Sequence, residues 1–182
     1  MEIIDTIFEE AKLIKVKKHD DSRGYFLESF NEKEFHKSGL HYQFIQDNHS
    51  YSMHKGTLRG LHYQLNPWAQ TKLIRVIAGE IMDVIVDLRK SSKTYGKWQS
   101  FILNSAENIQ LLVPKGFAHG FCTLTKDTHV FYKVDNYYSK KHERGIIWND
   151  KSLNISWPFD KIIASEKDNN LSSFLDCENN FF

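Results

Sequence analysis

Cysteine and proline are both rare in this chain. Its 182 residues include two cysteines, Cys122 and Cys177, and three prolines. No CxxC pair or metal-ligand spacing is present, and two cysteines cannot form the dense disulfide framework of a small secreted domain. We therefore expect two free thiols in a reducing compartment, in a chain long enough to bury its core without disulfides.

The chain also lacks an excess of charge of either sign and any long apolar run. Lys and Arg total 24 against 23 Asp and Glu, so no global field favours nucleic acid or an anionic membrane, although local anion sites stay open. No window approaches 18 apolar residues, and the N-terminus has no basic segment followed by an apolar stretch. These absences predict a cytoplasmic protein that binds neither nucleic acid nor a membrane.

Short strand-like segments make up most of the chain. They are rich in β-branched and aromatic residues, alternate with a period close to two, and are separated by turn residues such as Asn66-Pro67 and Ala78-Gly79. The expected strands span 26–30, 72–77, 81–88, 98–103, 109–113 and 129–134. This pattern is typical of a β-sandwich or barrel.

Helix is expected in two short stretches only. One spans 31–37, where Asn31 can cap the helix, and the other spans 168–177. Because no repeat or linker interrupts the pattern, the sequence predicts one all-β domain over 1–182, with 169–182 as a C-terminal tail. The tail either stays partly disordered or docks through its two final phenylalanines.

Two histidine-containing runs stand out among the expected strands. His62 lies in LRGLHYQ, and His119 lies in PKGFAHGF, which resembles the second cupin motif, PxGxxHxF, of the jelly roll, or double-stranded β-helix. In many cupins this histidine binds a metal together with two histidines and a glutamate of a first motif. Here Gln64 stands where the second histidine of that motif belongs, and no glutamate follows at the expected spacing. Two imidazoles without a carboxylate make a poor metal site, so we predict none.

Several cations close to turns offer another use for the two histidines. Arg presents a planar fork to phosphate oxygens, and Lys acts as a point charge that stabilises a developing oxyanion. These cations are Arg23, Arg59, Lys72, Arg75 and Lys115. The alternative is that most of them are solvated surface residues, and we prefer it for Arg75, which alternates with Ile74 and Val76.

Eight runs, in order along the chain from near Asp20 to Asp168, resemble the dTDP-4-dehydrorhamnose 3,5-epimerase family of nucleotide-sugar epimerases. They are DSRGYFLESF (21–30), QDNHS (46–50), LRGLHYQ (58–64), KLIRV (72–76), PKGFAHGF (114–121), FYK with YYS (131–133 and 137–139), ERGI (143–146) and SEKD (165–168). The resemblance implies a cupin-type jelly roll with a few short, mostly C-terminal helices. It also implies an isomerase that needs no metal or cofactor.

The implied reaction removes and returns protons at the carbons that flank a 4-keto group. By resemblance, His62 is the general base, and Asp168 holds its other ring nitrogen. Lys72 stabilises the enolate oxygen, and Tyr132 returns a proton on the opposite face. Taken alone, Asp168 would be interpreted as a helix cap, Lys72 as a strand-edge lysine and Tyr132 as a packing aromatic.

The resemblance also implies a site for a nucleotide-diphosphate 4-keto sugar. Arg23, Phe26 and Glu28 would lie on an N-terminal strand exchanged between the subunits of a homodimer. The cleft would be completed by Gln46, Asn48, Arg59, His119, Tyr138, Glu143 and Lys167. For Phe26, core packing within an alternating strand is an equal alternative.

Other functions stay open at this point. A related 3,4-ketoisomerase would move the carbonyl, and a non-catalytic sugar-nucleotide-binding cupin would use the same residues without proton transfer. A metal-dependent cupin oxygenase is a more remote option. The set of a base, its carboxylate partner, a cation and an acid favours epimerisation. The sequence leaves open the nucleotide, dTDP or GDP, the sugar, and whether C-3, C-5 or both are inverted.

Overall fold

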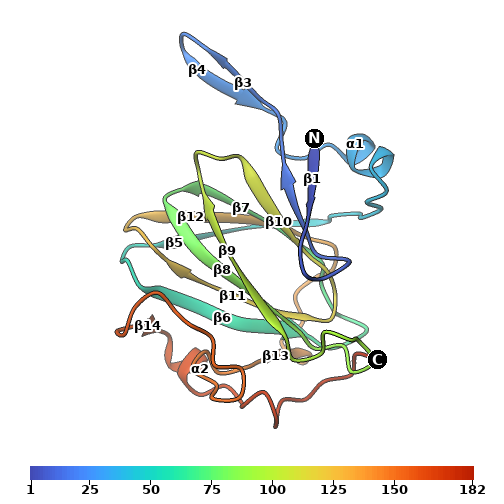
Figure 1. The fold of residues 1–182 in the computed structure, drawn as a ribbon, viewed down its shortest axis with the longest axis vertical. Helices are drawn as coiled ribbons and strands as arrows, with labels where there is room; N and C mark the ends of the chain where they lie inside the picture. Colours follow the sequence, from blue (N-terminus) through green and yellow to red (C-terminus); the bar gives the residue numbers. More distant parts are fainter.

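The computed structural model describes all residues, 1–182, as two β-sheets packed face to face (Figure 1). The strands are β1 (Glu2–Asp5), β2 (Lys12–Lys15), β3 (Lys18–Asp21), β4 (Gly24–Leu27), β5 (Gln46–Ser52), β6 (Thr57–Gln64), β7 (Lys72–Ala78), β8 (Glu80–Asp87), β9 (Trp98–Asn104), β10 (Ile109–Val113), β11 (Phe117–Thr123), β12 (Thr128–Val134), β13 (Glu143–Gly145) and β14 (Ile163–Ala164). The helices are α1 (Glu32–Lys37) and α2 (Glu166–Asn169).

The sheets have the strand orders β1-β2-β10-β7-β12-β5 and β13-β6-β11-β8-β9, with β14 added in parallel to β6. All other pairings are antiparallel. Apolar residues from both sheets fill the space between them, so the predicted cupin jelly roll is confirmed. Neither helix has the length and apolar character that crossing a membrane requires.

Strand β7 shows how alternation divides the two faces of a sheet. Ile74 and Val76 point into the core between the sheets, whereas Leu73 packs on the outer face against Phe35 of α1. Arg75 shares the parity of Leu73 and therefore points outward, as predicted.

The C-terminal tail covers the outer face of the second sheet. Phe181 is buried among residues of β6 and β8, while Phe182 is 83% exposed. Tyr63 of β6 donates a hydrogen bond to the carbonyl of Glu178, and Arg144 pairs with the Glu178 carboxylate at 2.6 Å. The tail therefore docks on the second sheet, and of its two final phenylalanines only Phe181 is buried there.

Most of the predicted strands are confirmed within about a residue, but β1, β2, β3, β5, β13 and β14 were not predicted. Helix α1 begins after Asn31, whose side chain accepts the amide of Glu34 as expected. The helix predicted over 168–177 is wrong, since α2 ends at Asn169. The chain beyond it is bound to other segments, because Ser172 accepts the amide of Ile147 and the amide of Phe174 donates to Asp150.

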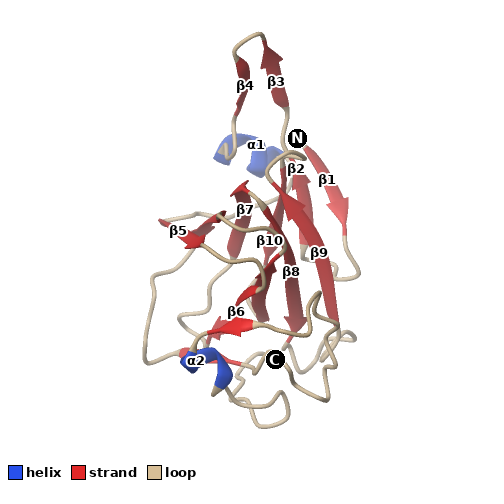
Figure 2. Cartoon of the chain, turned by 90° about the vertical axis from the view of Figure 1, so that its left-hand side faces the viewer, coloured by secondary structure: helices blue, strands red, loops and turns tan.

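The hairpin of β3 and β4 projects from the body at the end opposite α2 (Figure 1 and Figure 2). The two strands pair only with each other. The expected strand over 26–30 is therefore wrong beyond Leu27, and β4 is not part of the sandwich. A lone two-stranded hairpin is marginally stable in water, which makes this segment a candidate for contact with another chain.

A pair of glycines allows β6 and β11 to approach closely. A Cβ on Gly60, which has φ 127°, would lie 2.5 Å from the Cα of Gly120 and 2.8 Å from the carbonyl oxygen of His119. The register of this pairing places His62 opposite His119 and then shifts before Phe121. The two glycines thus set the spacing of the two histidines.

Gly60→Ala is expected to lower the free energy of unfolding by about 2–4 kcal/mol, because positive-φ strain adds to backbone overlap. Gly24→Ala is the matched control, since Gly24 has φ 134° and no heavy atom within 4 Å of the added Cβ. It should cost only the strain, about 1–2 kcal/mol. Urea unfolding of both variants measures the difference, and equal losses would contradict the role given to the glycine contact.

Candidate active site

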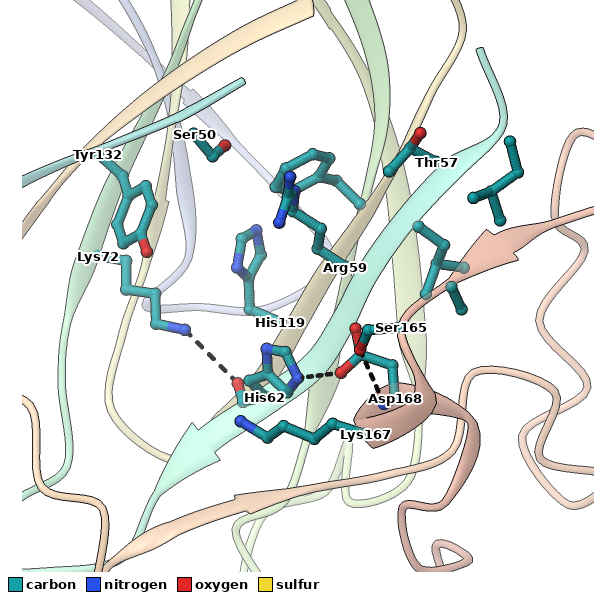
Figure 3. A pocket seen from close by; sticks show the side chains of 14 residues that line it. Ser50, Thr57, Arg59, His62, Lys72, His119, Tyr132, Ser165, Lys167 and Asp168 are labelled. Carbon is teal, nitrogen blue, oxygen red and sulfur yellow. Dashed lines mark hydrogen bonds and ion pairs between the residues drawn. The ribbon is translucent and has the colours of Figure 1, made fainter. Parts of the chain in front are cut away.

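A cavity of about 520 Å³ opens between the two sheets, and His62, Lys72 and Tyr132 line it (Figure 3). A smaller hollow of about 210 Å³ is lined by the same three residues. The two hollows therefore form one cleft, and three of the four predicted catalytic residues lie where they meet. The fourth, Asp168, lies in the wall of the larger hollow.

His62 and Asp168 form an imidazole–carboxylate pair. The Nε2 of His62 lies 2.6 Å from Oδ1 of Asp168, and the carboxylate side chain is only 6% exposed. Burial raises the pKa of Asp168, but its hydrogen bonds with His62 and Ser165 outweigh that effect, so the pKa is lowered. The ionised carboxylate holds the proton on Nε2 and leaves Nδ1 of His62 as the basic nitrogen.

The position of Asp168 follows from local structure around α2. Ser165 caps this short helix and accepts the amide of Asp168 at 3.1 Å. Just before the cap, Ile163 and Ala164 of β14 pair with the start of β6. This pairing brings residues more than a hundred positions apart in sequence into one site.

Lys72 extends from the first residue of β7 into the cleft. Its Nζ lies 3.5 Å from the carbonyl oxygen of His62. Burial lowers the pKa of Lys72 from 10.5 to about 8, against the opposing influence of Asp83 and Glu143. Lys72 is therefore a cation held at the cost of desolvation, which is the state that interacts most strongly with a developing negative charge.

Tyr132 of β12 faces the cleft from the sheet opposite His62 (Figure 3). Burial raises the pKa of its hydroxyl, although the nearby Arg59 opposes this effect. The phenol is therefore protonated at neutral pH and can donate its proton. The cleft thus holds a base on one sheet and an acid on the other.

Arg59 and His119 line the larger hollow beside this acid–base pair. The guanidinium of Arg59 donates to the carbonyl of Tyr51 at 2.9 Å. Nε2 of His119 lies 2.9 Å and 3.0 Å from the two carboxylate oxygens of Asp83. Sequence reasoning missed Asp83, although an acidic residue within the apolar run IMDVIV was a usable signal.

Four of the other predicted binding residues, Gln46, Asn48, Tyr138 and Glu143, line the smaller hollow, and Lys167 lines the larger one. Glu143 pairs with Lys167 at 2.6 Å and accepts the hydroxyl of Tyr138 at 3.0 Å. Burial raises the pKa of Glu143, but the effects of these two partners together are larger. The pKa is therefore lowered, and the carboxyl is ionised. Gln46 donates to Asn48 at 2.9 Å, and both residues lie on β5 of the opposite sheet.

Three predicted binding residues lie outside the cleft of their own chain. Arg23, Phe26 and Glu28 belong to the projecting hairpin and the segment after it. The side chain of Arg23 is 88% exposed, and its guanidinium pairs with Asp21 at 2.7 Å. Because Phe26 is 68% exposed, its alternative interpretation as a core residue is wrong.

The donors in the cleft do not converge as metal ligands would. No group of three or more His, Cys, Asp or Glu comes together, and Asp168 and Asp83 each bond to an imidazole. Gln64, at the position of the missing cupin ligand, accepts the amide of Ser139 and donates to the carbonyl of Trp68, both at 2.6 Å. It braces the segment after β12 instead.

A jelly roll with an imidazole, a phenol and a buried ammonium around one cleft has the groups that an enzyme of general acid–base chemistry needs. Comparison with known proteins narrows the class. The family model described as dTDP-4-dehydrorhamnose 3,5-epimerase matches residues 5–176. The enzyme of that name from Shigella flexneri is 49% identical over 98% of both chains, and that from Methanothermobacter thermautotrophicus is 45% identical over 92% of this chain and 91% of its own.

Solved structures agree with the sequence relatives. The Bacillus anthracis dTDP-4-dehydrorhamnose 3,5-epimerase, with TDP and PPi bound, has a TM-score of 0.93 at 53% identity, over 94% of this chain and 98% of that chain. The Legionella pneumophila dTDP-6-deoxy-D-glucose-3,5-epimerase, in complex with dTDP-4-keto-L-rhamnose, has a TM-score of 0.90 at 42% identity, over 94% and 92%. The chain belongs to the dTDP-4-dehydrorhamnose 3,5-epimerase family of isomerases.

Lys72→Met is expected to raise the melting temperature at pH 7 by roughly 3–6 °C, because it removes a buried charge without changing the side-chain volume much. The pKa of Lys72 is about 8 in the folded protein and 10.5 ordinarily, so the unfolded chain binds this proton more tightly. The stability of the wild type therefore rises between these two pH values, and the advantage of the variant shrinks.

Calorimetry of the wild type and Lys72→Met at pH 7 and pH 9.5 checks this expectation. Lys115→Met is the control, because the Lys115 side chain is 46% exposed and pairs with Asp135. It should give no gain at either pH. A gain for Lys72→Met that is the same at both pH values would contradict the depressed pKa.

Proposed function

We propose that this protein inverts both C-3 and C-5 of a dTDP-linked 4-keto-6-deoxyhexose, in deoxysugar or surface-polysaccharide biosynthesis. The observation that carries the proposal is the placement of the base His62 and the acid Tyr132 on opposite sheets of one cleft. Two solved relatives, one with TDP and PPi bound and one in complex with dTDP-4-keto-L-rhamnose, support the nucleotide and the keto sugar.

In the first step, Nδ1 of His62 removes a proton from the carbon next to the carbonyl. Asp168 supports this step, because it binds Nε2–H and stabilises the imidazolium that forms. The electrons of the broken C–H bond move to the carbonyl oxygen and give an enolate. The ammonium of Lys72 stabilises that oxygen in a cleft with little water.

In the second step, Tyr132 donates its proton to the opposite face of the same carbon. The carbon is thereby inverted and the carbonyl restored, with one proton gained by His62 and one lost by Tyr132. Exchange with solvent returns both groups to their starting states. C-3 and C-5 both flank the C-4 carbonyl, so the same four residues serve either carbon.

The diphosphate and nucleoside occupy the rest of the cleft in this proposal. Arg59 and His119 supply donors to the diphosphate beside the reacting sugar. The nucleoside contacts the polar group around the smaller hollow. That group consists of Gln46, Asn48, Tyr138 and Glu143, and Lys167 pairs with Glu143 from the larger hollow.

The substrate site is completed by a second subunit in this proposal. The hairpin of β3 and β4 exchanges within a homodimer, so that Arg23, Phe26 and Glu28 reach the cleft of the partner subunit. The exposure of Tyr25 and Phe26, at 53% and 68%, supports this arrangement, because two neighbouring exposed aromatics favour a protein contact.

Turnover in D₂O tests the reaction and its residue roles. With dTDP-4-keto-6-deoxyglucose, the wild type should place deuterium at C-3 and C-5 and keep the carbonyl at C-4, as read by NMR of the product. A carbonyl at C-3 would indicate a ketoisomerase instead. His62→Asn should lose about 10²–10⁴-fold in rate, since it lacks the general base. Thermal stabilisation of the variant by dTDP, compared with GDP, serves as the binding control.

Tyr132→Phe separates the acid from the base in the same experiment. Because His62 remains, the variant should still exchange deuterium into the sugar but return it to the original face, so that exchange outpaces inversion. Equal losses of exchange and inversion would assign Tyr132 to binding or packing. If neither His62→Asn nor Tyr132→Phe lost deuterium exchange, the proposed mechanism would be wrong.

Mixed dimers test the exchanged hairpin. Arg23→Ala and His62→Asn should each be weakly active alone, while dimers formed by refolding the two variants together should recover about a quarter of wild-type activity. This recovery follows because half of the random dimers are mixed and one of their two clefts carries no substitution. If Arg23 served its own cleft, every cleft would carry at least one substitution and mixing would restore nothing.

A further inference from the structure

A carboxylate without a solvent-exposed atom lies beneath the cleft. Asp83 is 0% exposed and shares the inward parity of Ile81 and Ile85 on β8. Its neighbours in register are Phe121 of β11 and Phe101 of β9, both core residues. A charged group in such surroundings is costly unless partners compensate for it, so the contacts of Asp83 indicate its purpose.

His119 is the hydrogen-bonding partner of this carboxylate. Its Nε2 lies 3.0 Å from Oδ2 and 2.9 Å from Oδ1, and only Oδ2 is aligned to accept a hydrogen bond. Because a carboxylate cannot donate, the proton of His119 resides on Nε2. Nδ1 is therefore the nitrogen left for a ligand in the cleft that His119 lines.

The negative charge of Asp83 also acts on Lys72, which enters the cleft from β7 in the facing sheet. Asp83 raises the pKa of Lys72 against the larger effect of burial. Glu143 of β13 acts in the same direction. The other titratable or charged groups that line the cleft around Lys72 are His62, Arg59 and Tyr63 of β6, His119 of β11, Tyr132 of β12, Tyr138 after it, and Asp168 and Lys167 of α2.

We propose that Asp83 is a positioning residue for two groups of the cleft: it orients His119 toward the substrate and holds Lys72 in its ammonium form. The inference rests on the proposed function, since it assigns the two groups to the substrate. Asp83 stands to His119 as Asp168 stands to His62, but it sits deeper and cannot reach the substrate itself. One buried charge thus serves both a binding group and the enolate-stabilising group.

Asp83→Asn tests this role, because the amide keeps the size of the side chain and can still accept the Nε2–H of His119, while the charge is lost. We expect kcat to fall roughly 10–100-fold, as is usual when a supporting carboxylate is removed, with KM changed less than kcat. The alkaline limb of the pH profile of kcat should move to lower pH. Without Asp83, Lys72 loses its proton more readily, and only its ammonium form stabilises the enolate.

Asp87→Asn is the matched control on the same strand. Asp87 is also 0% exposed, but its partners are Arg89, Ser92 and Thr94, none of which lines the cleft. It should lower the melting temperature and leave the alkaline limb in place. If Asp83→Asn behaved in the same way, Asp83 would be a structural residue and the proposal would fail.

Imidazole ¹⁵N spectra of the wild type test the orientation without any substitution. His119 should carry its proton on Nε2 in the absence of ligand, and a proton on Nδ1 alone would overturn the assignment. This measurement keeps the proposal testable if Asp83→Asn does not fold. The measurement also distinguishes failure of the proposed function from failure of the role given to Asp83. A wild type without epimerase activity would contradict the proposed function, while the spectra would still test whether Asp83 orients His119.

Discussion

The pairing of β6 with β11 is the constraint on which the rest of the site depends. It places His62 opposite His119, and it is possible only because two glycines allow the backbones to approach. Strand β14 pairs with the start of β6, and this pairing places Asp168, four residues after β14, beside His62. Lys72 of β7 and Tyr132 of β12 belong to the opposite sheet and face β6 across the cleft.

Sequence reasoning could predict the parts of the fold in which local pattern and burial agree. Strands such as β8 and β10 are apolar, and their bounds were predicted to within a residue. Strand β5 was missed because its polar residues meet solvent on one face and the cleft on the other, which removes the apolar signal. The chain after α2 was mistaken for helix because its hydrogen-bonding partners, such as Asp150, lie in other segments.

The candidate site shows the same division between what is local and what is not. The family resemblance supplied the four proposed catalytic residues, and the cleft brings all four together. Asp83 was overlooked because its significance depends on a strand neighbour 36 positions away in sequence. The hairpin residues could not be judged from alternation either, because β4 has a strand partner on only one side and no sheet to pack against.

Charge balance within the cleft connects substrate binding to chemistry. Before any ligand arrives, the anions Asp83 and Glu143 raise the pKa of Lys72, but it stays at about 8 because burial has the larger effect. In the proposed function, the diphosphate adds negative charge to the same cleft, which raises the pKa of Lys72. The ammonium that this proposal assigns to the enolate is then favoured most when substrate is present, so the desolvation of Lys72 costs the empty enzyme most.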